Sequence, residues 1–179
     1  MPTDDEPHGE LVLETARLRL RPWRVSEAAI QRELWAERDA RVPERRRIDA
    51  LGRPTVADIA EGIRAAGPPS TIGLLAVERK DAGDLIGYAG LAEGGSETEG
   101  EPELAYELLR RTWGQGYATE AARAVLEWAR SGAHERVWAT VWDWNTGSLR
   151  VLEKLGFTEV RRVRSDEVGA TNVVTMRPL

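Results

Sequence analysis

The stretch Arg111-Thr112-Trp113-Gly114-Gln115-Gly116-Tyr117-Ala118-Thr119-Glu120-Ala121 joins two segments of different periodicity. Residues 103–109 before it have the pattern of a strand, and residues 117–130 after it carry apolar side chains at helical spacing. Two glycines at such a junction allow a tight turn and leave amide N–H groups uncovered where the helix begins. Because these donors and the positive end of the helix dipole point the same way, the junction predicts a site for an anion such as a pyrophosphate.

The junction differs from the common nucleotide-binding loops. A Rossmann fingerprint needs Gly or Ala at the position of Thr119, and a Walker loop needs a Lys after the glycines. The pattern Arg111-x-x-Gly114-x-Gly116 instead resembles the acyl-CoA pyrophosphate loop of the GNAT N-acetyltransferases, and the string 113–121 resembles their Rim-type branch. The resemblance implies an enzyme that binds acetyl-CoA as co-substrate and acetylates a primary amine, either a protein N-terminal α-amino group or a small amine.

The order of predicted elements indicates one mixed α/β domain spanning residues 1–179, with residues 1–10 as a flexible tail. Strands are predicted at 15–21, 71–78, 84–91, 103–109, 137–142, 159–163 and 173–176, and helices at 23–37, 56–65, 117–130 and 145–155. The GNAT resemblance extends over nearly the whole chain, through residues 13–21 and 145–157. It implies a central, twisted, mixed but mostly antiparallel sheet flanked by helices.

Composition narrows the class of protein further. The chain has a formal net charge of −5, no cysteine and two histidines. This composition argues against a disulfide framework, a thiolate or histidine-rich metal site, a cysteine nucleophile and a nucleic-acid-coating role. No apolar run is long enough to span a membrane, and the acidic residues 4–6 are unlike the start of a secretory signal. We therefore expect a cytoplasmic monomer or homodimer without metal, membrane or nucleic-acid partners.

The predicted contacts with the cofactor are made mainly by backbone groups. The amides of residues 115–118, with Thr119 next to them, form the expected cradle, and Gly114 and Gly116 keep the approach open. The side chains of Arg110 and Arg111 either add positive charge for phosphate or are solvated at the strand end. The resemblance also implies that the N–H of Leu108 or Leu109 binds the oxyanion, provided that their strand splays from its neighbour.

Candidate catalytic carboxylates lie on the strand before the loop. The resemblance implies Glu103 as the general base, acting directly or through water. Glu107 shares its strand face, and Asp143 is the next alternative. For each of these residues, a plain surface position is the competing interpretation.

The helix that begins at Asn145 supplies two further candidates. Asn145 is expected to cap this helix, and the resemblance adds a contact with the pantetheine arm of CoA. Many GNAT enzymes carry a tyrosine acid where this chain has Leu152, so the resemblance passes the role of protonating the thiolate to Ser148. The alternative for Ser148 is a hydrogen bond to its own helix backbone. If residues 142–144 stay extended, Trp142 or Trp144 lines the acceptor pocket.

Two alternatives to a protein N-terminal acetyltransferase remain open at the level of sequence. One is an acetyltransferase for small amines, including aminoglycosides. The other is a non-catalytic GNAT module that binds acyl-CoA as a sensor or partner. Acceptor-binding loops vary freely on such scaffolds, so no residue pattern here identifies the acceptor.

Overall fold

The computed structural model of the chain describes residues 11–67, 69–98, 100–166 and 169–179, so the predicted tail at 1–10 lies outside the described residues. The strands are β1 (Leu13–Glu14), β2 (Leu18–Arg21), β3 (Gly73–Arg79), β4 (Leu85–Ala92), β5 (Glu103–Leu108), β6 (Arg136–Trp142), β7 (Thr158–Ser165) and β8 (Ala170–Pro178). The α-helices are α1 (Ala28–Glu37), α2 (Val56–Ala66), α3 (Tyr117–Ser131) and α4 (Thr146–Lys154). Short 3₁₀ turns are η1 (Val25–Glu27), η2 (Glu44–Arg46), η3 (Ser96–Thr98) and η4 (Arg110–Thr112).

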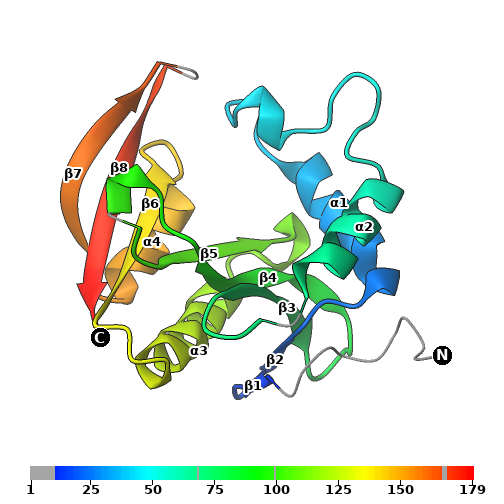
Figure 1. Ribbon diagram of the computed structural model, residues 1–179, viewed down its shortest axis with the longest axis horizontal. Coiled ribbons are helices and arrows are strands. Elements are labelled where there is room, and N and C mark those ends of the chain that lie inside the picture. The colour runs from blue at the N-terminus through cyan, green and yellow to red at the C-terminus, as the bar shows by residue number, and fades with distance from the viewer. Residues whose placement is uncertain (1–10, 68, 99, 167–168) are drawn as a thin grey trace.

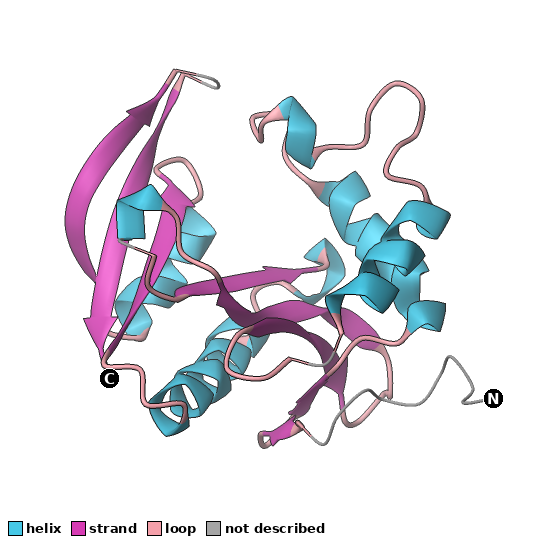
Figure 2. Ribbon diagram, viewed as in Figure 1, coloured by secondary structure: helices cyan, strands magenta, loops and turns pink. Residues whose placement is uncertain are grey.

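The strands form one eight-stranded sheet in the order β1-β2-β3-β4-β5-β6-β8-β7. Neighbouring strands pair antiparallel except β5 and β6, which pair parallel. The helices cover both faces of the sheet, and β6, β7 and β8 lean away from the other strands (Figures 1 and 2). The predicted fold class, a mixed and mostly antiparallel sheet flanked by helices, is therefore confirmed.

The main core lies between the sheet and α3. Small and branched residues of α3 pack against this face without measurable exposure, among them Ala121, Ala122 and Val125. Alanines let the helix axis approach the sheet closely, which is what the small residues in the first half of the predicted helix indicated. The start of α3, at the predicted glycine junction, is thereby held beside the end of β5 (Figure 1).

The opposite face of the sheet carries α1 and α2 over a smaller apolar cluster that includes Trp23, Leu85 and Tyr88. Thr55 caps α2 as predicted, because its side chain accepts the Asp58 N–H while the Asp58 carboxylate accepts the Thr55 N–H. Within the described residues, no helix has the length and apolar character needed to cross a membrane.

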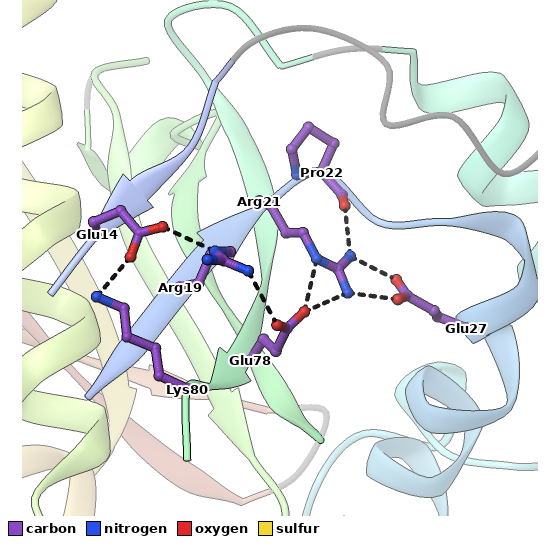
Figure 3. A network of polar contacts seen from close by, with 7 residues as sticks. All are labelled: Glu14, Arg19, Arg21, Pro22, Glu27, Glu78 and Lys80. Atoms are coloured by element: carbon purple, nitrogen blue, oxygen red, sulfur yellow. Dashed lines mark hydrogen bonds and ion pairs between the residues drawn. The ribbon is translucent and has the colours of Figure 1, made fainter. Parts of the chain in front are cut away.

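A buried arginine ties β2 to the start of α1. The guanidinium of Arg21, which is 6% exposed, donates five hydrogen bonds, to Glu27, Glu78 and the Pro22 carbonyl, at 2.7–3.2 Å. Figure 3 shows this network together with the outer pairs of Arg19 and Lys80 with Glu14. The buried charge of Arg21 is thus compensated by two carboxylates.

The first predicted strand and helix differ from the structure at their boundaries. Residues 15–17 form a turn instead of strand, because the Thr15 hydroxyl accepts the Leu18 N–H at 2.8 Å and the Thr15 N–H bonds to the Leu18 carbonyl at 2.9 Å. The helix predicted from Trp23 begins only at residue 25, as the 3₁₀ turn η1 that leads into α1. The last strand, predicted at 173–176, extends over the whole of β8.

Candidate active site

The candidate site begins where β5 and β6 separate. Their register consists of one residue pair, Glu103 opposite Trp138, next to a hydrogen bond from the Trp138 N–H to the Pro102 carbonyl at 3.0 Å. Beyond this pair the two strands diverge (Figure 1). We call the unpaired edge of β5 after Glu103 the splay. Backbone N–H groups on this edge have no strand partner after Glu103 in the described part of the chain and are therefore available to an extended ligand.

The antiparallel pairing with β4 decides which amides face the splay. The Leu109 N–H donates to the Ile86 carbonyl at 2.8 Å, so this donor is already used. Because successive amides in a strand point to opposite edges, the Leu108 N–H faces the splay. The Trp113 indole N–H donates to the Leu108 carbonyl at 2.6 Å on the same edge. The geometry favours Leu108 over Leu109 as the candidate oxyanion donor.

The glycine junction forms an uncapped helix start. Gly114 and Gly116 have φ angles of 75° and 83°, in the left-handed region that favours glycine, and no side chain caps α3. The first helical hydrogen bond runs from the Glu120 N–H to the Gly116 carbonyl at 3.1 Å. The amides of residues 117–119 consequently have no acceptor inside the helix. This arrangement can bind an anion at the positive end of the α3 dipole.

Two charged residues hold this loop in place. The Glu120 carboxylate accepts the Thr15 hydroxyl at 2.7 Å, the Arg17 N–H at 2.8 Å and the Arg17 Nε at 2.6 Å. Arg17 also donates to the Gln115 carbonyl at 3.0 Å and stacks on the Tyr117 ring at 4.4 Å. Burial acts to raise the pKa of Glu120, but these hydrogen bonds outweigh it and hold the pKa below its usual value.

Arg110 and Arg111 are tied to α1. The backbone N–H of Arg110 donates to the Glu37 carboxylate at 2.7 Å, and its guanidinium donates to the Glu37 carbonyl at 2.6 Å. The guanidinium of Arg111 donates to Glu33 at 2.8 Å and to the Leu85 carbonyl at 3.3 Å. A contact of either side chain with phosphate, which stays a prediction, requires it to exchange these partners.

Glu103 keeps one oxygen free at the start of the splay. Its Oε1 accepts the hydroxyl of Thr98, which is fully buried, at 3.0 Å and the Gly95 N–H at 3.4 Å. Its Oε2 has no hydrogen bond within the described part of the chain. A carboxylate fixed by one oxygen and open at the other has the arrangement that a proton acceptor needs.

Glu107 is bound on both oxygens. The Arg38 guanidinium donates to Oε1 at 2.9 Å and to Oε2 at 2.7 Å, and the Tyr88 hydroxyl donates to Oε2 at 3.0 Å. Burial and the nearby carboxylate raise the pKa of Tyr88, which stays protonated as a donor. Asp143 lies in the turn after β6, where its N–H donates to the Thr171 carbonyl at 2.9 Å. Of the three carboxylates, Glu103 best matches a general base.

The start of α4 faces β5 through Tyr106, a residue that no sequence pattern had marked as part of the site. Asn145 is confirmed as the cap, since its Oδ1 accepts the Ser148 N–H at 3.2 Å. The Tyr106 hydroxyl donates to the Ser148 carbonyl at 3.2 Å, and burial raises the pKa of Tyr106 to about 12. The Ser148 hydroxyl makes no hydrogen bond among the described residues. Leu152 is 2% exposed and belongs to the core.

The splay and the glycine-rich start of α3 define an α/β domain suited to an extended ligand that carries an anionic group. The Acetyltransferase (GNAT) domain family matches residues 17–158. The chain therefore belongs to the GNAT acetyltransferase family. Among the described residues, no group of His, Asp or Glu side chains is arranged to hold a metal ion.

The chain is similar to a Bacillus subtilis protein, YkkB, with 35% identity over 97 residues, which cover 52% of this chain and 55% of that protein. It spans about half the length of the curated relatives it matches. A GnaT-family structure from Bordetella pertussis has 27% identity and a TM-score of 0.71, covering 94% of this chain and 99% of that one. Mycobacterium smegmatis RimJ, in complex with CoA-disulfide, has 21% identity and a TM-score of 0.74, covering 96% and 89%.

Proposed function

We propose that this protein transfers the acetyl group of acetyl-CoA to a primary amine. The observation that carries the proposal is the uncapped start of α3 at Gly116, where the unpaired amides lie next to the splay of β5. A pyrophosphate at these amides places the acyl arm along the edge that presents the Leu108 N–H. Family membership supports acetyl-CoA as the donor.

The reaction follows from direct attack in a ternary complex. Glu103 takes a proton from the ammonium group, the amine nitrogen bonds to the thioester carbon, and the Leu108 N–H stabilises the oxyanion. The carbon–sulfur bond then breaks and the electron pair leaves with sulfur. Ser148 donates a proton to the thiolate, and the second proton that the bonded nitrogen loses on becoming an amide is relayed through water to restore the Ser148 hydroxyl. No nucleophilic side chain is needed, in keeping with a chain without cysteine.

We further propose a Rim-type enzyme whose acceptor is a protein N-terminal α-amino group. The string Trp113 to Ala121 supports this assignment, as does the shared fold with a RimJ that was solved with CoA-disulfide. A small amine is the competing acceptor, and binding without turnover is the competing function. Both are outcomes of the following test.

Release of free thiol from acetyl-CoA is measured with N-terminal peptides, polyamines and aminoglycosides. We expect turnover with at least one amine class, and Glu103→Gln lowers it on the order of a hundredfold near neutral pH. The loss is smaller at high pH, where the free amine is already abundant. Glu127→Gln, on the exposed face of α3, is the matched control. Tight acetyl-CoA binding without turnover on any amine would instead identify a sensor module.

A further inference from the structure

A short segment after α1 is fastened to β5. We call residues 38–47 the strap. Arg38, at its start, donates to both oxygens of Glu107 on β5, and its side chain is only 9% exposed. The same guanidinium donates to the Arg46 carbonyl at 2.8 Å and stacks on the Trp35 ring at 4.0 Å. The first end of the strap is therefore rigidly held on the β5 side of the splay.

The strap makes a second contact on the β6 side. The Arg41 guanidinium lies 4.1 Å from the centroid of the Trp144 ring, in the turn between β6 and α4. Asp39 orients Arg41 by accepting its Nε and its terminal nitrogen, each at 2.8 Å, and its backbone N–H at 2.9 Å. The Trp144 indole N–H is buried without an acceptor in the described part of the chain. The Arg41 guanidinium therefore meets the face of this ring, while the indole N–H takes no part in holding the strap.

These two contacts place the strap across the splay. Glu107 belongs to β5 and shares a strand face with Glu103, whereas Trp144 follows β6. Figure 1 shows the strap and the β6–α4 turn on the same side of β5, opposite α3. An acceptor that approaches Glu103 from this side must pass under the strap or displace Arg41 from Trp144.

We infer that the contact between Arg41 and Trp144 sets the girth of the amine that the site accepts, a specificity role that rests on the proposed function. A slender, unbranched primary amine reaches Glu103 with the contact intact. A bulky or ring-borne amine requires the strap to open. The two anchors differ in strength, because Arg38 makes a buried bidentate ion pair while the side chain of Arg41 is 58% exposed. The strap therefore opens at Arg41.

The test compares kcat/KM for an unbranched alkylamine and for a rigid aminocyclitol. Arg41→Ala is expected to raise kcat/KM for the aminocyclitol roughly two- to fivefold, the range that an exposed cation–π contact supports, and to leave the alkylamine unchanged. Trp144→Leu should raise kcat/KM for the aminocyclitol by a similar factor. Combining it with Arg41→Ala should give no further increase, because both substitutions remove the same contact. Arg53→Ala is the control, since Arg53 pairs with Asp49 on the same connection between α1 and α2.

An unchanged preference between the two amines in Arg41→Ala, or an equal loss for both, would overturn the inference and make the contact purely structural. A second readout does not depend on turnover. Amide exchange across residues 39–47 should rise in Arg41→Ala and stay at the wild-type level in Arg53→Ala. If the wild type acetylates no amine, the proposed function fails, while a rise in exchange would still show that Arg41 fastens the strap.

Discussion

Two regions of the molecule's sheet treat polar groups in opposite ways. At β2, the guanidinium of Arg21 makes five hydrogen bonds and is 6% exposed. At the end of β5, the Leu108 N–H faces the splay, and the amides of residues 117–119 lack acceptors inside α3. The region at β2 is a closed network of side-chain charges, whereas the region at the end of β5 is an open set of backbone donors.

The difference separates a structural site from a candidate binding site. Buried donors in proteins are nearly always paired, so a set of unpaired backbone amides at a helix start is stabilised when a ligand supplies the acceptor. A closed network has no unpaired donor or acceptor left to bind a ligand. Changes at Arg21 should therefore alter the free energy of unfolding and leave binding intact, whereas changes at the splay and at the glycines before α3 should alter turnover or acetyl-CoA affinity.

The largest expected effect is on stability. Arg21→Met leaves the Glu27 and Glu78 carboxylates without their shared partner, and we expect a loss of about 3–5 kcal/mol in the free energy of unfolding. Urea unfolding measures it. Arg19→Met is the control, because this neighbour is 46% exposed and its loss should lower the free energy of unfolding far less. Equal costs for the two variants would remove the distinction between a buried network and surface pairs.

The second largest effect is expected on turnover, from a substitution at the splay. Ser148→Ala is expected to lower turnover roughly ten- to a hundredfold, with acetyl-CoA affinity near wild type, if the serine protonates the thiolate. Steady-state kinetics and calorimetry check the two quantities. Thr146→Ala, an exposed hydroxyl on the same helix, should change neither. A matching fall in affinity would mark Ser148 as a binding contact, and full activity would mean that water supplies the proton.

Local patterns predicted the glycine-rich start of α3 better than the contacts that hold it in place. Gly114 and Gly116 mark the start of α3 because their φ angles are ones that few other residues adopt. The helical pattern predicts Glu120 on the solvent-facing side of an amphipathic helix, yet its carboxylate binds Arg17, which lies 103 residues earlier in the chain. The spacing of apolar residues gives no information about a contact between residues so far apart in the sequence. The extended geometry considered for residues 142–144 is wrong, since β6 ends at residue 142 and a turn follows.

Cofactor affinity should depend on the loop backbone. Gly116→Val is expected to weaken acetyl-CoA binding at least about tenfold, because a β-branched side chain covers the amides and strains a backbone with φ of 83°. Calorimetry measures the affinity. Gly83→Val is matched for strain, with φ of 67° and open space around it, but it lies in the β3–β4 turn and should leave affinity unchanged. If a folded Gly116→Val variant bound acetyl-CoA with wild-type affinity, the amides at the start of α3 would not belong to the cofactor site.

The smallest expected effect links the first turn of α3 to pH. The pKa of Glu120 is held below its usual value in the folded chain, so its contribution to stability is complete above about pH 4.3 and is lost as the pH falls further. Glu120→Gln should cost on the order of 1 kcal/mol at neutral pH and flatten the fall of stability in acid. Urea midpoints between pH 3 and 7 measure this. Glu127→Gln, which is 65% exposed on the same helix, should keep the wild-type slope. An unchanged slope in Glu120→Gln would mean that the contacts of Glu120 with Thr15 and Arg17 order the α3 loop without stabilising the fold.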